Sequence, residues 1–222
     1  MKTNVELQTD VQNAIKWEPL LQAAEIGVTT KDGVVSLSGE VDSYAKKIEA
    51  ENAAKSVIGV KGLIEKIKVK FSNSWKKTDT QITDDVLKAL DASYSVPKDK
   101  LKIKVENGWI TLSGELPWNY QRENAEYAIN FLEGVKGVTN DISIRSVSQD
   151  AIEQKDVEKA LRRSALEDSD IKVRVSGTTI TLFGTVNSWY QKEEAERIAW
   201  KTNGIWHVKN ELTIDYYYEL VE

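Results

Sequence analysis

Few side chains in this sequence could carry out chemistry. Among 222 residues there is one histidine, His207, and no cysteine. The chain therefore has no thiolate nucleophile and no Cys-ligated metal site, and a single imidazole lacks the partners that a triad or a metal centre needs. The acidic run Glu167–Asp170 offers oxygen atoms, but it does not have the spacing of an EF-hand calcium loop. We expect no catalytic residue, no metal and no cofactor.

Tryptophan and tyrosine are the unusual feature. The chain has seven Trp and eight Tyr but three Phe. Trp and Tyr carry an apolar ring with a polar tip, a combination that is typical of membrane interfaces and protein interfaces. The candidate lipid- or partner-binding residues are the aromatic groups and their basic neighbours at three similar places, with two further tryptophans: Tyr44, Lys46, Lys47, Trp118, Tyr120, Arg122, Trp189, Tyr190, Lys192, Trp200 and Trp206.

Two interpretations of these aromatic clusters stay open at this point. They could form an exposed surface for lipid or protein, with a neighbouring helix N-terminus offering N–H groups to an anionic headgroup. Alternatively, they could pack one part of the chain against the next. Trp200 stands where other copies of the same pattern have Lys55 and Asn130, so we expect its ring to face outward.

The elements that position these residues occur three times. Each copy has a short apolar run that ends in a glycine, followed twenty residues later by a second glycine. The first glycines are Gly39, Gly114 and Gly184, and the second are Gly59, Gly134 and Gly204. Equal spacing in three copies predicts a tandem repeat. We place the domains at 1–73, 74–148 and 149–222.

Each copy predicts the same order of elements. An amphipathic helix comes first, with Val11, Val86 and Val157 at equivalent buried positions. Two alternating strands follow, joined by a turn such as Asn107-Gly108, which is typical of a β-hairpin. An alanine-striped helix and a last strand complete the copy. The fold class is α+β, with three tandem α-β-β-α-β units, each a three-stranded mixed sheet packed on two helices.

The second helix of each copy carries a predicted start signal. Ser188-Trp189-Tyr190-Gln191 fits a capping box, and Asp42-Ser43 and Asn119 are the candidates to cap the other two copies. The aromatic clusters therefore fall where a strand passes into a helix.

The sequence resembles the BON domain, named for bacterial osmotically inducible protein Y and nodulation. The resemblance rests on the hydrophobic-Ser-Gly step at Val35–Gly39 and Ile110–Gly114, and on the Gly-Val-Lys-Gly runs at 59–62 and 134–137. In the third copy His207 replaces the last of these glycines. We interpret the recurring glycines as structural residues: Gly39, Gly59, Gly62, Gly114, Gly134, Gly137, Gly184 and Gly204. The resemblance implies attachment to phospholipid membranes, a link to osmotic or envelope stress, and no catalytic residues.

Charge and hydropathy limit the partners. The chain has 30 basic and 35 acidic side chains, a formal net charge of −5, which argues against a nucleic-acid partner and limits attraction to anionic lipid. No apolar run is long enough to span a bilayer, and no signal peptide precedes the first helix, which predicts a cytoplasmic protein, or a periplasmic one if a leader was removed. The predicted function is a non-enzymatic binding module for phospholipid, with a protein-interaction or chaperone-like scaffold as the alternative. The oligomeric state stays open.

Overall fold

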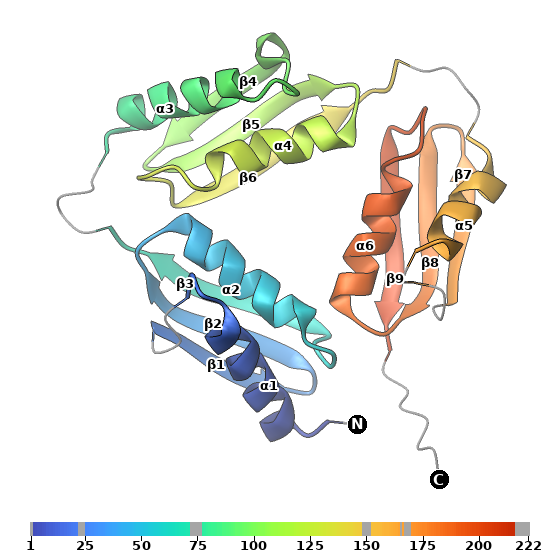
Figure 1. Cartoon of the computed structure of the whole chain (residues 1–222), viewed down its shortest axis with the longest axis horizontal. Coiled ribbons are helices and arrows are strands. Elements are labelled where there is room, and N and C mark those ends of the chain that lie inside the picture. The colour runs from blue at the N-terminus through green and yellow to red at the C-terminus, as the bar shows by residue number, and fades with distance from the viewer. Residues whose placement is uncertain are drawn as a thin grey trace. The chain divides into compact units, whose positions relative to one another are not determined.

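Three small sheets make up the framework of the protein (Figure 1). The computed structural model describes residues 2–21, 25–71, 77–147, 152–164, 166 and 170–215. The strand orders are β1-β2-β3, β4-β5-β6 and β7-β8-β9. The six α-helices come in pairs, so the predicted α-β-β-α-β order is confirmed in all three repeats.

The bounds of the elements are close to equivalent from one repeat to the next. The first repeat contains α1 (Asn4–Trp17), β1 (Ile26–Lys31), β2 (Val34–Val41), α2 (Tyr44–Ser56) and β3 (Gly62–Val69). The second contains α3 (Asp79–Ala92), a 3-10 turn η3 (Lys98–Lys100), β4 (Leu101–Glu106), β5 (Trp109–Leu116), α4 (Asn119–Ile129) and β6 (Gly137–Ile144). The third contains α5 (Gln154–Arg162), β7 (Asp170–Ser176), β8 (Thr179–Val186), α6 (Trp189–Ala199) and β9 (His207–Ile214).

Backbone contacts group the chain into two compact units. One comprises Met1–Gly39, Ile48–Lys68 and Asp150–Glu222, and the other comprises Glu40–Lys47 and Val69–Gln149. The sheet of the third repeat therefore lies entirely in the first unit, and that of the second repeat lies entirely in the second. The boundaries at 1–73, 74–148 and 149–222 remain our proposal for the covalent limits of the repeats.

The hairpins form where the sequence predicts them. Strands β4 and β5 pair antiparallel up to Glu106 and Trp109, so Asn107 and Gly108 form a two-residue turn. Both turn residues have positive φ, 52° and 83°, as a type I′ turn requires. The third strand of the second and third repeats is parallel to the middle strand, which makes these sheets mixed.

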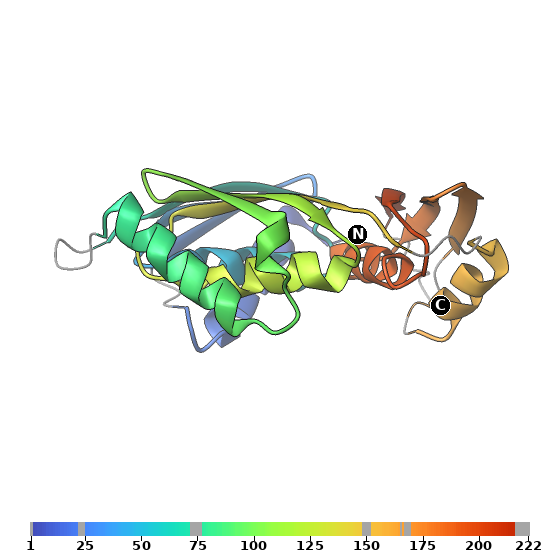
Figure 2. The ribbon, with the colours of Figure 1, turned by 90° about the horizontal axis from the view of Figure 1, so that it is seen from above.

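Each sheet buries one face against its two helices, which lie on the same side of the sheet (Figure 2). In β5 the side chains of Ile110, Leu112 and Leu116 are buried. The alanines of the second helix, such as Ala125, are buried against this face because a small side chain lets the helix lie close to the strands.

The glycine at the sixth position of each middle strand is required by close backbone approach. Gly114 has φ 141°, and a Cβ atom placed on it would overlap the carbonyl group of Lys100, the last residue of η3 before β4. Gly184 has φ 116° and the same relation to the Asp170 carbonyl. No L-residue with a side chain fits this position without moving the strand.

The volume of the cross-strand partner explains why the glycine at the start of the last strand is replaced by His207 in the third repeat. Gly137 pairs with Trp109 across β5 and β6, and the Trp109 ring covers the space that a Cβ atom would need. In the third repeat the same pair is Thr179 and His207. A small threonine leaves room for the histidine, so the larger side chain of the pair lies on the middle strand in the second repeat and on the last strand in the third.

Candidate functional site: the aromatic face of the second repeat

Three exposed aromatic side chains lie on α4 and just after its C-terminal end. Tyr120, Tyr127 and Phe131 are 51%, 66% and 60% exposed. Tyr120 and Tyr127 are seven positions apart and so lie on one side of the helix axis, whereas the buried residues Ala125 and Ile129 lie on the opposite side. Phe131 lies in the turn two residues after the last residue of α4. We call Tyr120, Tyr127 and Phe131 the aromatic face.

Two of these rings contact each other. The ring centroids of Tyr127 and Phe131 lie 5.2 Å apart at an interplanar angle of 72°, an edge-to-face arrangement. The loop that carries the fully exposed Tyr94 lies beside the same helix, because Asn124 donates a hydrogen bond from Nδ2 to Ser95 Oγ at 2.9 Å. The second repeat therefore presents several aromatic side chains to solvent on and around α4.

Sequence reasoning missed Tyr127 and Phe131. The predicted aromatic residues lie at the strand-to-helix junctions, as Tyr120 does, and not further along the helix. A signal was available for Tyr127, since the same 3.6-residue period that identifies the buried alanine stripe also aligns it with Tyr120.

The equivalent helices of the other repeats lack this face. On α6 the positions of Tyr120, Tyr127 and Phe131 are held by Tyr190, Arg197 and Lys201, and Tyr190 is exposed. On α2 the same positions are Ala45, Asn52 and Ser56. The aromatic face is thus a property of the second repeat.

Several of the predicted binding residues are held by the protein itself. Lys192 Nζ donates to the main-chain oxygen of Leu212 at 2.6 Å. Lys46 Nζ forms an ion pair with Asp42 at 3.0 Å. Trp189 is half-buried, and its Nε1 donates to Glu193 Oε1 at 3.0 Å, one turn along α6.

Trp200 differs from its prediction. It is 8% exposed, so the expectation that its ring faces outward is wrong. The equivalent residues Lys55 and Asn130 are themselves half-buried, which means that the position is not an outer one, and a larger ring there loses nearly all contact with water. Its Nε1 lies 3.4 Å from Glu196 Oε1.

The remaining predicted residues are intermediate in exposure. Tyr44, Lys47, Trp118, Arg122 and Trp206 are all half-buried. Their ring and chain atoms contribute to packing around the strand-to-helix junctions, and they offer less surface to a partner than the aromatic face does.

The caps of the second helices follow the predicted pattern in part. At the start of α2, Ser43 Oγ accepts from Lys46 N at 3.4 Å, as predicted. Ser188 caps α6 by accepting from Gln191 N at 3.1 Å, but the Gln191 side chain accepts from Asn187 N, so the reciprocal capping box is not made. Asn119 lies inside α4 and is buried, with its Nδ2 donating to Glu123 at 2.7 Å. The N-cap of α4 is Trp118, which has no side-chain oxygen to act as a cap.

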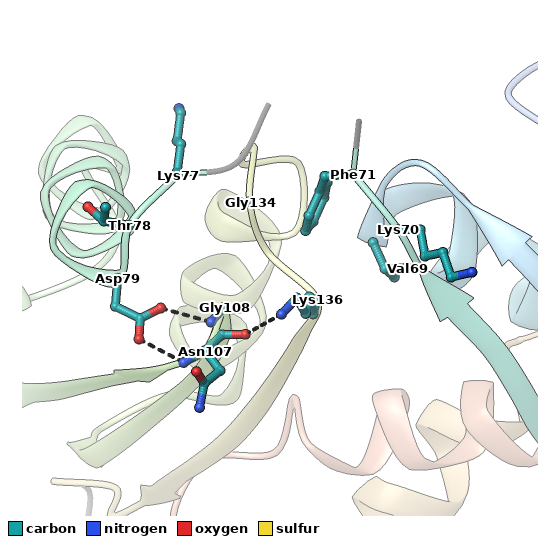
Figure 3. A pocket seen from close by; sticks show the side chains of 10 residues that line it. All are labelled: Val69, Lys70, Phe71, Lys77, Thr78, Asp79, Asn107, Gly108, Gly134 and Lys136. Atoms are coloured by element: carbon teal, nitrogen blue, oxygen red, sulfur yellow. Dashed lines mark hydrogen bonds between the residues drawn. The ribbon is translucent and has the colours of Figure 1, made fainter. Parts of the chain in front are cut away.

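A pocket of about 570 Å³ lies at the hairpin end of the second repeat (Figure 3). Its polar groups bind one another. The carboxylate of Asp79 accepts hydrogen bonds from the backbone N–H groups of Asn107 and Gly108 at 2.7 and 2.9 Å. Lys136 Nζ donates to the main-chain oxygen of Asn107 at 2.8 Å. The N–H groups of the turn are thus already bonded to an aspartate of α3, and these hydrogen bonds hold the hairpin to that helix.

Lys77 lines the same pocket and is also held by partners. Its Nζ lies 2.7 Å from Asp85 Oδ2 and 3.3 Å from Glu133 Oε2. The hydrogen bond from Lys77 lowers the pKa of the Asp85 carboxyl, and that same bond raises the pKa of Lys77. These paired charges stabilise the repeat and provide no general acid or base poised near neutral pH.

Comparison with known proteins assigns the family. The BON domain model matches residues 3–70, 78–146 and 149–216, which together cover most of the chain. The chain belongs to the BON domain family.

The BON repeats are similar to a bacterial relative. Osmotically-inducible protein Y of Escherichia coli (strain K12) is 32% identical over 129 residues, which are 56% of this chain and 64% of the relative. The match therefore spans somewhat less than two thirds of the relative's length.

Two solved structures from Chlamydia trachomatis are distant neighbours of these BON repeats. Both are of CdsD, a structural protein of the type III secretion system, and each is 17% identical to this chain. One covers 95% of this chain and 93% of its own, with a TM-score of 0.27, and the other, the C-terminal domain, covers 97% and 100%, with a TM-score of 0.26. No function follows from likeness at this level.

Membrane-spanning helices and metal centres are two further kinds of feature that could carry a function. Within the described residues, no helix is long and apolar enough to cross a membrane. Nor does that part of the chain contain a group of three or more side chains placed to hold a metal ion. The acidic residues Glu167 and Asp168 lie outside the described residues.

Proposed function

We propose that this BON protein is a non-enzymatic module that binds the surface of phospholipid membranes peripherally. The aromatic face of α4 is the observation that carries the proposal. Three rings with more than half of their surface exposed, two on α4 and one in the turn just after it, form an exposed apolar patch of the kind that marks an interaction site. Tyrosine hydroxyls at two of the three positions suit the water-rich side of a membrane interface.

The charge of the chain sets the character of this binding. Each basic side chain near an anionic surface contributes about 1 kcal/mol of attraction, and a protein of net charge −5 has little of this to gain overall. We therefore propose that insertion of the rings supplies most of the binding free energy. Binding should then depend weakly on salt and on the fraction of anionic lipid.

The family supports a cellular setting for this function. The curated relative is named for its induction by osmotic stress. We propose that this chain acts under osmotic or envelope stress, by binding to the surface of the stressed membrane.

Vesicle co-sedimentation tests the proposal. The full chain is mixed with neutral phosphatidylcholine vesicles and with vesicles that contain phosphatidylglycerol, at low and at physiological salt. The triple variant Tyr120→Ser/Tyr127→Ser/Phe131→Ser should partition at least about tenfold less, because loss of three inserted rings removes more than about 1.4 kcal/mol of apolar transfer free energy.

A matched control distinguishes binding through the aromatic face from nonspecific adsorption to vesicles. Trp17 is 88% exposed on α1 and does not belong to the aromatic face, so Trp17→Ser should leave partitioning unchanged. Failure of the unmodified chain to bind either vesicle at low salt would sink the lipid proposal. An equal loss in Trp17→Ser and in the triple variant would remove α4 as its site.

A further inference from the structure

The outer face of the third sheet, which is the side away from α5 and α6, carries an ordered group of hydrogen-bond donors. Ile180 and Leu182 of β8 are buried. Because successive side chains of a strand point to opposite faces, the threonines on either side of Ile180 lie on the outer face. Strand pairing continues this face onto β7 and β9, and the two rows nearest the hairpin turn are Arg174, Thr181 and Lys209, and Ser176, Thr179 and His207. We call these six residues the donor strip.

The donor strip contains no carboxylate, and each of its side chains carries an N–H or O–H donor. The acidic residues of the same face lie toward the other end of the sheet. Asp170 is paired with Lys172 at 3.4 Å, and Glu211 lies opposite Phe183 in the register of β8 and β9. A surface that combines several donors and positive charges, without a carboxylate among them, attracts an anion.

The two cations of the donor strip are available to a ligand. Arg174 and Lys209 are exposed, and neither forms an ion pair with another described residue. The Arg174 guanidinium lies 5.3 Å from the centroid of the Phe183 ring, a contact that restrains the side chain without giving its N–H groups a carboxylate. Strands β7 and β9 flank β8, so the Cα atoms of Arg174 and Lys209 are roughly 10 Å apart with Thr181 between them. Two long side chains at this spacing can meet one oxyanion above the threonine hydroxyl.

The other two sheets do not repeat this arrangement. In the second repeat the place of the arginine is held by Lys104, which is paired with Glu106 at 2.9 Å. In the first repeat the same place is held by Thr29, which has no charge. The place of the lysine is held by Thr139 in the second repeat and by Ile64 in the first. The pair of cations on either side of a central hydroxyl is therefore a property of the third repeat.

The surroundings of the donor strip favour a soluble anion over a membrane. Among the described residues of the third repeat, the large hydrophobic side chain that is exposed is Tyr190, which lies on α6, on the helix side of the sheet. On the outer face the neighbours of the strip are charged and hydroxyl side chains and the half-buried Phe183. A surface that lies in a membrane interface needs exposed apolar side chains beside its basic ones, and the described residues of this face provide none.

We propose that the donor strip binds the phosphate group of a small soluble phosphate ester. The phosphate oxygens accept hydrogen bonds from Arg174 and Lys209 on either side and from the hydroxyl of Thr181 between them. The second row of the strip lies beside the alcohol part of the ester and offers its oxygen atoms hydroxyl and imidazole donors. This site is separate from the aromatic face of the second repeat, and it does not rest on membrane binding.

Glycerol phosphate is the probe. It is titrated into the isotope-labelled full-length chain at low ionic strength, and binding is followed by the shifts of backbone amide signals in NMR spectra. The largest shifts should occur in β7, β8 and β9 at the hairpin end of the sheet. Arg174→Met and Lys209→Met should each raise the dissociation constant at least about threefold, because each removes one of the two charges beside the phosphate at an exposed site.

Lys104→Met is the matched control. It removes the same charge from the equivalent position of the second repeat, where Lys104 is already paired with Glu106, and it should leave the dissociation constant unchanged. Raising the salt from about 20 mM to about 200 mM should weaken binding, since the cations of the strip are exposed to screening. Thermal unfolding of each variant shows that loss of binding does not come from loss of the fold.

Three results would overturn the proposal. The first is a titration in which glycerol phosphate shifts no signal of the third sheet. The second is an equal weakening in Lys104→Met and Lys209→Met, which would mean that the ligand responds to the net charge of the chain and not to the strip. The third comes from co-sedimentation with phosphatidic acid vesicles. If Lys209→Met lowers binding to those vesicles while glycerol phosphate does not bind the unmodified chain, the strip belongs to a lipid headgroup instead.

Discussion

The second and third repeats share one sheet-and-helix framework but differ in how the first helix begins. In both, an asparagine of the last strand is bonded to the second helix: Asn140 Nδ2 donates to Arg122 O and to Glu126 Oε2, and Asn210 Nδ2 donates to Lys192 O and to Glu196 Oε2. These four bonds are between 2.9 and 3.1 Å long. The helix start, in contrast, is capped by Thr78 in the second repeat, whereas α5 of the third repeat begins four positions later when the repeats are aligned, and its N-cap, Glu153, makes no side-chain capping hydrogen bond.

This difference separates what the fold requires from what it leaves variable. The three strands and the second helix make their contacts in the third repeat although α5 begins later than α3 does. Residues at the start of the first helix, and on the outer side of the second helix, are therefore available to differ between repeats. The aromatic face of α4 lies in one of these variable parts.

The largest expected effect tests the shared framework. Gly114→Ala and Gly184→Ala each place a Cβ atom, at a positive φ, on a carbonyl group at the start of the neighbouring chain segment, that of Lys100 just before β4 and that of Asp170 in β7. Each change should cost roughly 3 kcal/mol or more of unfolding free energy, because strand backbone must move. Hydrogen exchange of β5 and β8 should show loss of protection in the mutated repeat. A repeat that tolerates the alanine would show that its middle strand does not need this close approach.

The second prediction addresses the helix start directly. Ile82→Ala should destabilise the second repeat by about 3 kcal/mol, since it removes a fully buried aliphatic side chain and leaves a cavity. Glu153→Ile at the aligned position should instead stabilise the third repeat, by about 1 kcal/mol, as an exposed charge gives way to an apolar side chain in the lining of a groove of about 690 Å³ that Val157 and Ile198 also line. Chemical denaturation of the two variants measures both. If Glu153→Ile is neutral, the groove is not the counterpart of the Ile82 site.

The third prediction concerns the asparagine bridge. Asn140→Ala and Asn210→Ala should each cost about 2 kcal/mol, because each leaves two partly buried acceptors on the second helix without a donor. The effects should be alike in the two repeats if the framework is truly shared. In the first repeat the aligned residue is Glu65, whose side chain accepts from Ile67 N as the asparagines accept from the residue two positions on. A strong effect in one repeat and none in the other would contradict a common framework.

Much of this framework could be predicted from the sequence, because it depends on local signals. The turn at Asn107 and Gly108, the alternation in β5 and the alanine stripe of α4 are each readable from a few neighbouring residues. The repetition of these signals at near-constant spacing strengthened each of them. The resemblance to the BON domain added the family on the same residues.

The candidate sites were less predictable, since they depend on neighbours distant in sequence. The sequence around Trp200 carries no local signal that distinguishes a buried ring from an exposed one. The equivalent residue Lys55 suggested an exposed position, whereas Trp200 is buried. The difference at the start of α5 could have been suspected from Glu153, which aligns with two aliphatic residues. Only the structure shows that these two residues, Leu7 and Ile82, lie in the core.

The smallest expected effect lies in the ion pairs that accompany the helix start. The pKa of Asp85 is lowered chiefly by its hydrogen bond from Lys77. A lowered carboxyl pKa contributes stability above the ordinary value of about 4, and this contribution is lost as the pH falls through the folded-state pKa. The raised pKa of Lys77 acts oppositely: its contribution is present below the ordinary value of about 10.4 and is lost as the pH rises through the folded-state value. The pair therefore stabilises the second repeat across the neutral range.

Lys77→Met keeps the aliphatic stem and removes only the charge. It should lower the stability of the second repeat by about 0.5 kcal/mol at neutral pH, and the difference from the unmodified chain should shrink as the pH falls through the folded-state pKa of Asp85. Lys159→Met is the counterpart in the third repeat, where the pair with Asp156 is far more exposed and should be worth less. Denaturation midpoints at a series of pH values compare the two. Equal pH-dependent losses would mean that the lysine ahead of α3 stabilises its repeat no more than an exposed ion pair does.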